Sequence, residues 1–525
     1  MLQDVNPGVL AGLAWYYLLA SALNAAAAAH VAYAEMVGEG ADVAGLAPRT
    51  RRFPGWLGPV LVGLYGPALL ILGLRGWIPG GTTAAYGLAA LANGLLALTA
   101  GADAAHFAEV RASGGVHADE AHPSLDDHVP AAGLGGPINR TLWALVWSVV
   151  AVVFQAIGLT YLFHGPLVLP SFARAGVDSM AGPTTFFLGS ALLFAATLRF
   201  RRVVANGLVA FGVVNLSILA FGLSLTDGDF RRIVSTPDNV PIVGLIVLAA
   251  GFTWLALRRG VINDARRAEG LPVLEALEQD RVLSWPDLVY IELICMVAMT
   301  LFLIAWAVAL PAPLEQPAKM TEAPNPAKAP WYFLGLQEML VYFDPWLAGV
   351  GIPVVIIVGL CAIPYLDVNE EGRGYYTAAS RPFAMATFLF GFLVLWVVLI
   401  VLGTFLRGPN WNFFGPYERW DPYKVVPLNN VDLSDLVWIR ALGRAKPSWA
   451  PLRELPGLAL LAFYLFALPP ILLRTLFKGY AAKAGTARAA VAVVLLLLMA
   501  GLPLKMMLRW TLNLKYVVAI PGFNI

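Results

Sequence analysis

The chain has 525 residues, of which 59% are hydrophobic and 13% are charged, with a formal net charge of +2 at pH 7. A soluble domain carries about 25% charged residues, so this composition excludes an ordinary soluble protein, and the near-neutral charge does not indicate nucleic-acid binding. The two cysteines, Cys295 and Cys361, lie in separate apolar runs without a CxxC or CxxCH motif, which excludes covalent attachment of a c-type haem.

Apolar runs recur along the whole chain. A helix needs about 20 mostly apolar residues to cross ~30 Å of hydrocarbon. No basic segment or small-residue cleavage site accompanies the first run, so we expect it to be retained as a helix. The runs predict an all-α, polytopic membrane protein with about twelve transmembrane helices, at residues 9–30, 56–78, 82–104, 140–164, 183–199, 203–225, 240–258, 287–310, 348–366, 382–406, 456–475 and 487–508.

A charged linker, "RRGVINDARRAEGLPVLEALEQDRVLSWPD", separates the seventh span from the eighth. Its leucines, Leu271, Leu274 and Leu277, predict a short amphipathic helix on the inner membrane surface. We therefore divide the chain into a seven-helix module of unassigned role, this cytoplasmic linker, a second helical module, a long outer loop, and two further helices with an outer tail. These parts cover residues 1–258, 259–284, 285–406, 407–455 and 456–525.

The orientation follows from basic residues in short loops, which mark the cytoplasmic side. With the N-terminus outside, the cytoplasmic connections contain Arg49, Arg51, Arg52, Arg199, Arg201, Arg202, Arg258, Arg259, Arg266, Arg267, Arg373, Arg381, Arg474, Lys478, Lys483 and Arg488. This predicts a multi-pass protein of the bacterial inner (plasma) membrane. The N-terminus and the connection between the eighth and ninth spans are expected on the periplasmic side.

Six histidines are available as haem or metal ligands. His30 and His106 close the first and third predicted spans at the inner end, where they could share a haem or a metal; the alternative is a pair of interfacial histidines bonded to helix carbonyls. No predicted span carries two histidines about 13 residues apart, the spacing that stacks two haems through the bilayer. We therefore expect no self-sufficient haem b protein.

One carboxylate falls inside a predicted span. Glu292, in "WPDLVYIELICM", lies about one and a half turns into the eighth span. A carboxylate within a membrane is a functional candidate, and this one could serve proton uptake or bind a quinone head group. The alternative is a side chain that reaches water at the inner interface.

Several short motifs follow one another between residues 285 and 406: Trp285 to Asp287, Asn325–Pro326, Trp331 to Phe333, Ile363 to Asp367 and Arg381–Pro382. In this order they resemble the C-terminal domain of cytochrome b in quinol–cytochrome c reductases, which is a separate chain, subunit IV, in cytochrome bf complexes. The resemblance does not extend to residues 1–258, which lack that family's four helices with paired histidines.

The resemblance implies that Pro330, Trp331, Tyr332 and Phe333 form one wall of a quinol-oxidation site. Glu292, singled out above as a carboxylate within a span, is expected as a further quinol-binding residue. Aromatic rings and proline suit an apolar slot for a quinone ring. The family has a Pro-Glu-Trp-Tyr motif whose glutamate accepts a proton, whereas this chain reads Ala329-Pro330-Trp331-Tyr332, with Pro330 at the position of the glutamate. Glu338 is expected to act as the catalytic base in its place, with Glu315, Glu322 and Asp344 as other acids in the region.

The predicted function is a membrane subunit of a cytochrome bc-type quinol-oxidising electron-transfer complex that also translocates protons. Its cofactor would be quinone or quinol, while partners would carry the redox centres: a haem b-bearing cytochrome b N-terminal-type subunit, a Rieske-type iron–sulfur subunit and a c-type cytochrome. The loop 407–455, rich in Trp, Tyr and Pro, packs on neighbours or docks such a partner. The alternatives are a non-catalytic scaffold joined to another respiratory enzyme, and a twelve-helix transporter, against which the lack of an internal repeat counts.

Overall fold

The computed structural model describes residues 7–41, 140–163, 167–277, 283–309, 317, 320–321, 323–369, 377–427 and 429–525. The predicted spans 56–78 and 82–104 lie outside these residues, as do His106, Glu315 and Glu322. His30 lies within helix α1 (Pro7–Ala41), but its side chain is not among the described ones.

The described part of the chain is a helical, multi-pass membrane protein. It contains eight helices that are long and apolar enough to cross a membrane, or up to ten if each of two bent helix pairs is one span. Every predicted span within the described ranges coincides with one of these helices or pairs, which confirms the all-α fold class. The total of twelve stays a prediction. The eight helices are Pro7–Ala27, Val146–Phe163, Val240–Ala268, Ser284–Ala309, Leu347–Leu366, Pro382–Leu406, Leu455–Arg474 and Thr486–Leu512.

Two of the predicted spans, 183–199 and 203–225, each belong to a bent pair of helices. Helix α5 (Ser171–Met180) meets α6 (Pro183–Arg199) at 90°, and Val209–Ser224 of α8 (Gly207–Ser224) meets α9 (Gly228–Ser235) at 112°. The second bend has a local cause. The side chain of Asp227 accepts hydrogen bonds from the backbone N–H groups of Asp229 (3.0 Å) and Phe230 (3.1 Å), so it caps α9 and starts a new helix.

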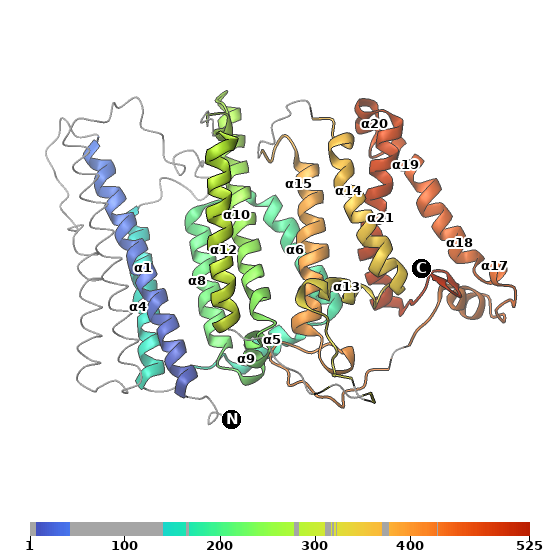
Figure 1. Cartoon of the computed structure of the whole chain (residues 1–525), viewed down its shortest axis with the longest axis horizontal. Helices are drawn as coiled ribbons and strands as arrows, with labels where there is room; N and C mark the ends of the chain where they lie inside the picture. Colours follow the sequence, from blue (N-terminus) through green and yellow to red (C-terminus); the bar gives the residue numbers. More distant parts are fainter. Residues whose placement is uncertain are drawn as a thin grey trace. The chain divides into compact units, whose positions relative to one another are not determined.

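Two compact units make up the chain: residues 1–171 with 202–231, and residues 172–201 with 232–525. This division does not follow the module boundaries predicted at 258 and 285, whose functional assignment stays a prediction. In the first unit α1, α4 (Arg140–Phe163) and α8 pack together, and α1 and α4 run side by side (Figure 1). Tyr17 is fully buried there between the rings of Phe154 and Tyr161, at centroid distances of 5.8 and 5.5 Å.

A polar layer crosses the first unit within the membrane. The Asn24 side-chain amide donates to the Asn215 Oδ1 atom at 2.5 Å, and the Ser21 hydroxyl donates to the Ala151 carbonyl at 2.8 Å. The side chains of Ser21, Asn24 and Asn215 are buried. Because lipid offers them no partner, such groups hydrogen-bond between helices and join α1 to α4 and α8.

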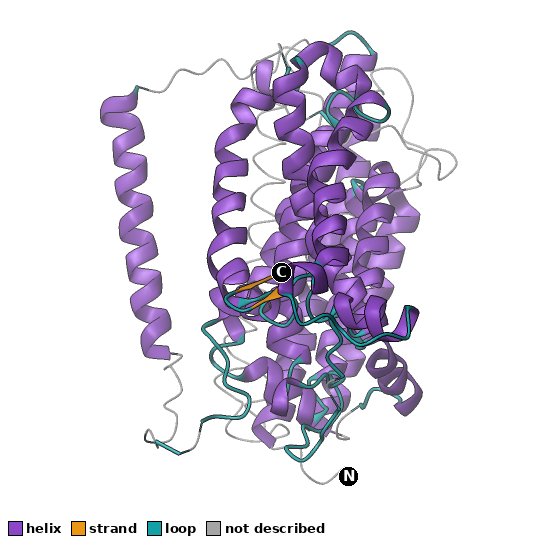
Figure 2. Ribbon diagram, turned by 90° about the vertical axis from the view of Figure 1, so that its right-hand side faces the viewer, coloured by secondary structure: helices purple, strands orange, loops and turns teal. Residues whose placement is uncertain are grey.

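The second unit contains the predicted site. Its apolar core includes Phe187, Met339, Tyr342, Leu399 and Met506. Its remaining helices are α10 (Val240–Ala268), α11 (Leu274–Leu277), α12 (Val289–Ala309), α13 (Leu334–Met339), α14 (Ile352–Leu366), α15 (Pro382–Leu389), α16 (Val398–Val401), α17 (Ala450–Arg453), α18 (Leu455–Ala462), α19 (Leu468–Arg474), α20 (Lys478–Ala484) and α21 (Thr486–Leu512), with α7 (Arg201–Val204) at its border with the first unit. Two short antiparallel strands, β1 (Ala519–Ile520) and β2 (Phe523–Asn524), close the chain beside the C-terminus (Figure 2).

Helix α10 extends to Ala268 rather than ending at residue 258, and the linker folds back on its end. The Asn263 side chain donates to Glu275 Oε2 at 2.7 Å and accepts from the backbone N–H of Leu274 at 3.0 Å. Arg266 Nε donates to the Pro272 carbonyl at 2.8 Å. Of the three leucines predicted to line an amphipathic linker helix, Leu274 and Leu277 lie in the single turn of α11, whereas Leu271 precedes it.

The two ends of the second unit carry different loops. At one end the hydroxyl of Tyr480 donates to the Leu366 carbonyl at 2.5 Å, and Arg381 forms an ion pair with Asp367. At the other end the segment 325–346, the loop 407–455 and the C-terminal tail contact one another. This arrangement agrees with the predicted order of inner and outer loops, while the compartment at each end stays a prediction.

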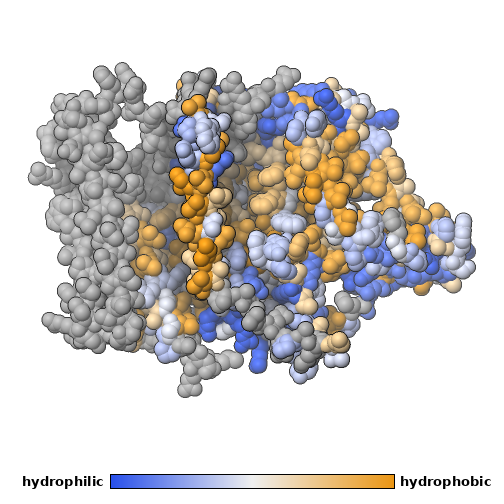
Figure 3. Space-filling view, in the orientation of Figure 1, coloured by the Kyte–Doolittle hydropathy of each residue, from blue (hydrophilic) through white to orange (hydrophobic). Residues whose placement is uncertain are grey.

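Few of the described residues pack around helix α12. None of the 18-residue apolar window in the span Ser284–Ala309 is buried. Apolar side chains cover this helix in Figure 3, with hydrophilic ones near its upper end in that view. An apolar helix exposed on all sides is stable only in lipid or against another chain.

Candidate functional site

The aromatic residues of the predicted quinol loop form one tight turn, Trp331–Phe333, which begins after Pro330. Trp331 packs against the buried side chains of Ile242, Leu334 and Ile400 and anchors the turn. Tyr332 and Phe333 remain 50% and 48% exposed, with ring centroids 4.7 Å apart. The turn therefore presents a pair of rings outward.

Glu338, the predicted catalytic base, lies in α13 one turn beyond the aromatic residues and is fully buried. Arg407 donates two hydrogen bonds to it, from Nε to Oε2 at 3.0 Å and from Nη2 to Oε1 at 2.7 Å. The hydroxyl of Tyr342 donates to Oε1 at 2.8 Å. Burial, followed by the adjacent carboxylate, raises the pKa of Tyr342 well above its usual value, which keeps this phenol a donor. Both oxygens of Glu338 are thus bonded within the protein, a geometry that favours structural anchoring; its role as the base stays a prediction.

Arg407 itself is held by the outer loop. It follows directly after the span Pro382–Leu406. Its guanidinium carbon lies 3.7 Å from the ring centroid of Phe413, and its Nη1 atom donates to the Trp411 carbonyl at 2.5 Å. The planar guanidinium can form two hydrogen bonds and stack on an aromatic ring at once, which a lysine could not do.

Lys328 lies beside this ion pair. The side-chain amide of Gln337 accepts from the N–H of Ala329 and donates to the carbonyl of Ala327, both at 2.8 Å, so it clamps the backbone on each side of Lys328. Lys328 Nζ donates to the Thr404 carbonyl at 2.7 Å and lies 4.9 Å from the ring centroid of Trp420.

Burial lowers the pKa of Lys328 to about 7, the carboxylate of Glu338 raises it, and the guanidinium of Arg407 lowers it further. The side chain of Thr404, whose carbonyl receives Lys328, is fully buried, and its hydroxyl has no hydrogen-bond partner among the described residues. We refer to the set as the Glu338 cluster, which consists of Lys328, Gln337, Glu338, Tyr342, Thr404 and Arg407.

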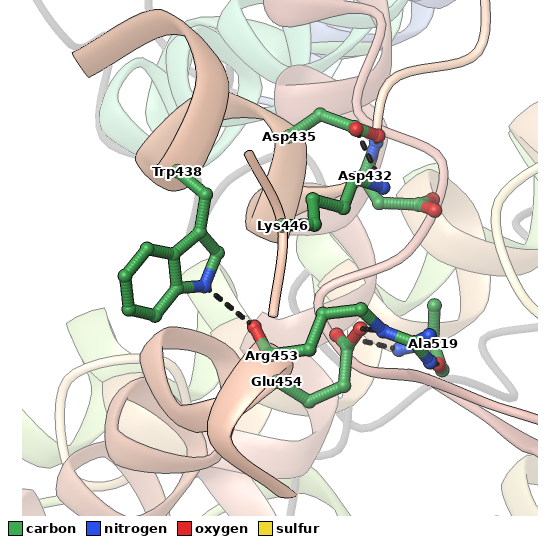
Figure 4. A network of polar contacts seen from close by, with 7 residues as sticks. All are labelled: Asp432, Asp435, Trp438, Lys446, Arg453, Glu454 and Ala519. Carbon is green, nitrogen blue, oxygen red and sulfur yellow. Dashed lines mark hydrogen bonds and ion pairs between the residues drawn. The ribbon is translucent and has the colours of Figure 1, made fainter. Parts of the chain in front are cut away.

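The outer loop and the C-terminal tail frame this end of the unit. Arg453 Nη2 donates to the carbonyl of Ala519 at 3.0 Å, and the backbone N–H of Ala519 donates to Glu454 Oε2 at 3.0 Å (Figure 4). The indole N–H of Trp438 donates to the carbonyl of Arg453 at 2.9 Å. These bonds hold the tail against the start of α18.

The outer loop and the C-terminal tail each form a hydrogen bond with the segment 325–346. The Asn325 side-chain amide donates to Asn410 Oδ1 at 2.9 Å. The Asn524 amide donates to Asp344 Oδ2 at 2.6 Å. The segment 325–346 is therefore bonded near each end to the outer loop or to the tail. Asp344, one of the other acids in the region, is engaged in this frame rather than in the Glu338 cluster.

The remaining predicted site residues lie apart from this cluster or outside the described residues. Glu292 is exposed on α12, and no hydrogen bond or ion pair of the described residues joins it to the Glu338 cluster. The side chains of His30 and His106 are not described. Among described residues no group of three His, Cys, Asp or Glu side chains could hold a metal ion.

The sequence-based interpretation missed Lys328 and Arg407. Lys328 directly precedes the motif Ala329-Pro330-Trp331-Tyr332, so the loss of the family's acid was a signal to look for another titratable side chain nearby. Arg407 follows the end of a predicted span, where an arginine also fits an interfacial anchor. Nothing in the sequence pairs it with Glu338.

No protein-family model and no solved structure matches the chain.

Proposed function

We propose that this chain is a membrane subunit of a cytochrome bc-type quinol-oxidising electron-transfer complex of a bacterial inner membrane. In this proposal the turn Trp331–Phe333 forms one wall of the quinol site on the periplasmic side. The quinol gives two electrons to one-electron metal centres on partner chains, which are haem b, a Rieske-type iron–sulfur centre and a c-type cytochrome, and its two protons leave on the outer side.

The observation that carries the proposal is the pair of exposed rings of Tyr332 and Phe333. Large apolar rings are expensive to leave in water, and a flat quinone ring can stack on them or meet them edge to face. The packing of Trp331 and the bonds of the Glu338 cluster hold the turn in place. Prior ordering of a binding surface reduces the entropy lost when a ligand binds. The order of motifs in 285–406 is the second support.

A photoreactive quinone analogue, added to the complex purified from membranes, tests the proposal. We expect label on a peptide from 325–346, competed by quinol. The double variant Tyr332→Ala/Phe333→Ala is expected to lose at least ten-fold of this label, because it removes both rings. Tyr423→Ala is the matched control, since Tyr423 is an 87% exposed aromatic residue of the outer loop. Label that is absent from this segment, or equal in the two variants, would overturn the proposal.

The exposure of α12 favours a second candidate, a non-catalytic scaffold that binds a partner chain. A scaffold would retain the partner subunits during purification without any competed quinone label. The same labelling experiment, with the subunits of the purified complex identified, therefore separates the two functions.

A further inference from the structure

Lys328 occupies a site built to hold a lysine side chain at the outer end of the second unit. Gln337 holds its backbone from both sides, the Thr404 carbonyl accepts its hydrogen bond, and the ring of Trp420 covers its amine. Such a set of contacts restricts a long, flexible side chain to one place, and that restriction costs side-chain entropy. A lysine on an ordinary loop surface is not held in this way.

The charged groups around Lys328 do not neutralise it. The carboxylate of Glu338 in α13 raises the pKa of Lys328, but it is already ion-paired with Arg407. The positive charge of Arg407 lowers the pKa of Lys328, because it disfavours a second cation. No carboxylate of the described residues lies within ion-pair distance of Lys328 Nζ. The Thr404 carbonyl and the Trp420 ring, which contact the amine, carry no net charge. Burial in this uncharged setting lowers the pKa of the amine to about 7, so it can act as a base under physiological conditions.

A second observation comes from Thr404. Its hydroxyl is fully buried and without a partner in the described part of the chain, and an unsatisfied buried hydroxyl is destabilising. The same residue accepts the hydrogen bond of Lys328. A buried hydroxyl without a partner, on the residue whose carbonyl binds the amine, is a polar group that a buried water can satisfy.

We propose that Lys328 is the proton acceptor of the outer-loop site, in place of the carboxylate that Pro330 displaces. This inference rests on the proposed function and deepens it, because it assigns the acid–base chemistry of the same site to a residue that the motif itself does not identify. Glu338 and Arg407 then act as positioning residues that set the charge around the amine.

The neutral amine of Lys328 forms a new N–H bond as one O–H bond of the quinol breaks. The electrons of the quinol pass one at a time to oxidised metal centres of the iron–sulfur and cytochrome type on partner chains. The resulting ammonium donates to the Thr404 carbonyl and then releases its proton to the outer aqueous phase, ready for the next proton. A general base in position typically contributes 10²–10⁴-fold to a rate.

The test measures quinol turnover of the intact complex between pH 5.5 and 9, together with labelling by the photoreactive quinone analogue. For the native chain we expect turnover to rise with pH about a midpoint near 7, because the amine is the active form. Lys328→Met removes the base, whereas Lys328→Arg keeps a permanent cation and a donor for Thr404. Both are expected to lose at least ten-fold in turnover above pH 7 and to lose the rise, while labelling is retained.

Lys424→Met is the matched control. Lys424 also donates to a backbone carbonyl, that of Phe413, and lies 4.2 Å from the ring centroid of Phe414, but it is ion-paired with Glu418. This variant should keep the native pH profile. A native pH profile in either Lys328 variant overturns the inference without contradicting the proposed quinol binding. Loss of labelling in both variants assigns Lys328 to binding or folding instead. Absence of competed label in the native complex refutes the proposed function, and the inference falls with it.

Discussion

Arg407 donates hydrogen bonds to both carboxylate oxygens of Glu338, at 3.0 and 2.7 Å, although 69 positions separate the two residues. The ion pair joins the short helix α13 of the aromatic loop to the chain that leaves the span Pro382–Leu406. Both side chains are almost completely buried, with 0% of Glu338 and 7% of Arg407 exposed. This long-range contact is therefore one of those on which the shape of the candidate site depends.

Breaking the pair should destabilise the protein strongly. Glu338→Ala leaves a buried guanidinium without its counter-ion, and Arg407→Ala does the converse; each is expected to cost about 3–5 kcal/mol. The double variant should lose less unfolding free energy than the sum of the two single variants, because it leaves no buried charge without its partner. Unfolding of the detergent-solubilised protein measures this, with Lys424→Ala as the control for a partly exposed ion pair, expected to cost about 1 kcal/mol or less. Equal costs for Glu338→Ala and Lys424→Ala would contradict the prediction.

The stability effect of Lys328 should depend on pH. Its pKa is about 7 in the folded protein and 10.5 as a free side chain, so between these values the unfolded chain binds more protons and stability rises with pH. Below pH 7 the cost of burying the cation is fully present. Lys328→Met should therefore raise the melting temperature most below pH 7, with a gain that shrinks toward pH 10. The free-energy difference is at most a few kcal/mol, since the side chain is partly exposed.

Melting temperatures of Lys328→Met and the native protein across this range check the prediction. The difference between the two proteins is the quantity of interest, because other groups titrate equally in both. A difference that stays constant from pH 6 to pH 10 would show that Lys328 is not buried as a titrating amine.

Gly457 should be indispensable for docking the C-terminal tail. A Cβ atom at this position of α18 would lie 2.0 Å from the Val517 carbonyl oxygen and 2.9 Å from Val518 Cγ2. Gly457→Ala is expected to displace the tail and to destabilise the fold by about 1–3 kcal/mol. Limited proteolysis at the tail reports the displacement. Gly479→Ala in α20 is the matched control, because nothing lies within 4 Å of its Cβ; it should be neutral or stabilise by up to about 1 kcal/mol. Equal protease resistance of the two variants would argue against the contact.

The polar pair in the first unit gives a separate prediction. Asn24→Leu removes the hydrogen bond to Asn215 between α1 and α8, and it should cost about 0.6–2 kcal/mol, the range found for such bonds in membranes. Thr160→Ala is the control, because the hydroxyl of Thr160 is exposed and bonds only to Ala156 within its own helix. Unfolding in detergent compares the two, and a larger loss for Thr160→Ala would contradict the assignment.

The sequence predicted the membrane-spanning helices well because lipid provides no hydrogen-bond partner for the backbone. Any apolar run of sufficient length must therefore satisfy its own backbone as a helix. The bends at α5–α6 and α8–α9 escaped prediction, because they lie at the ends of the predicted spans 183–199 and 203–225 and involve short helices beside them, such as α9, which Asp227 caps. The extension of α10 to Ala268 was also not predicted, because charged residues at the end of this helix form hydrogen bonds there, such as the bond from Arg266 to the Pro272 carbonyl.

For the candidate site, sequence analysis identified the aromatic residues Trp331, Tyr332 and Phe333 and the absence of an acid at position 330. The folded chain was needed to show which rings stay exposed, that Glu338 points inward to Arg407, and that Lys328 is desolvated beneath Trp420. These properties depend on contacts between segments tens of residues apart along the chain. The proton affinity and availability of a side chain are set by burial and by neighbouring charges, and no local pattern of residues records either of them.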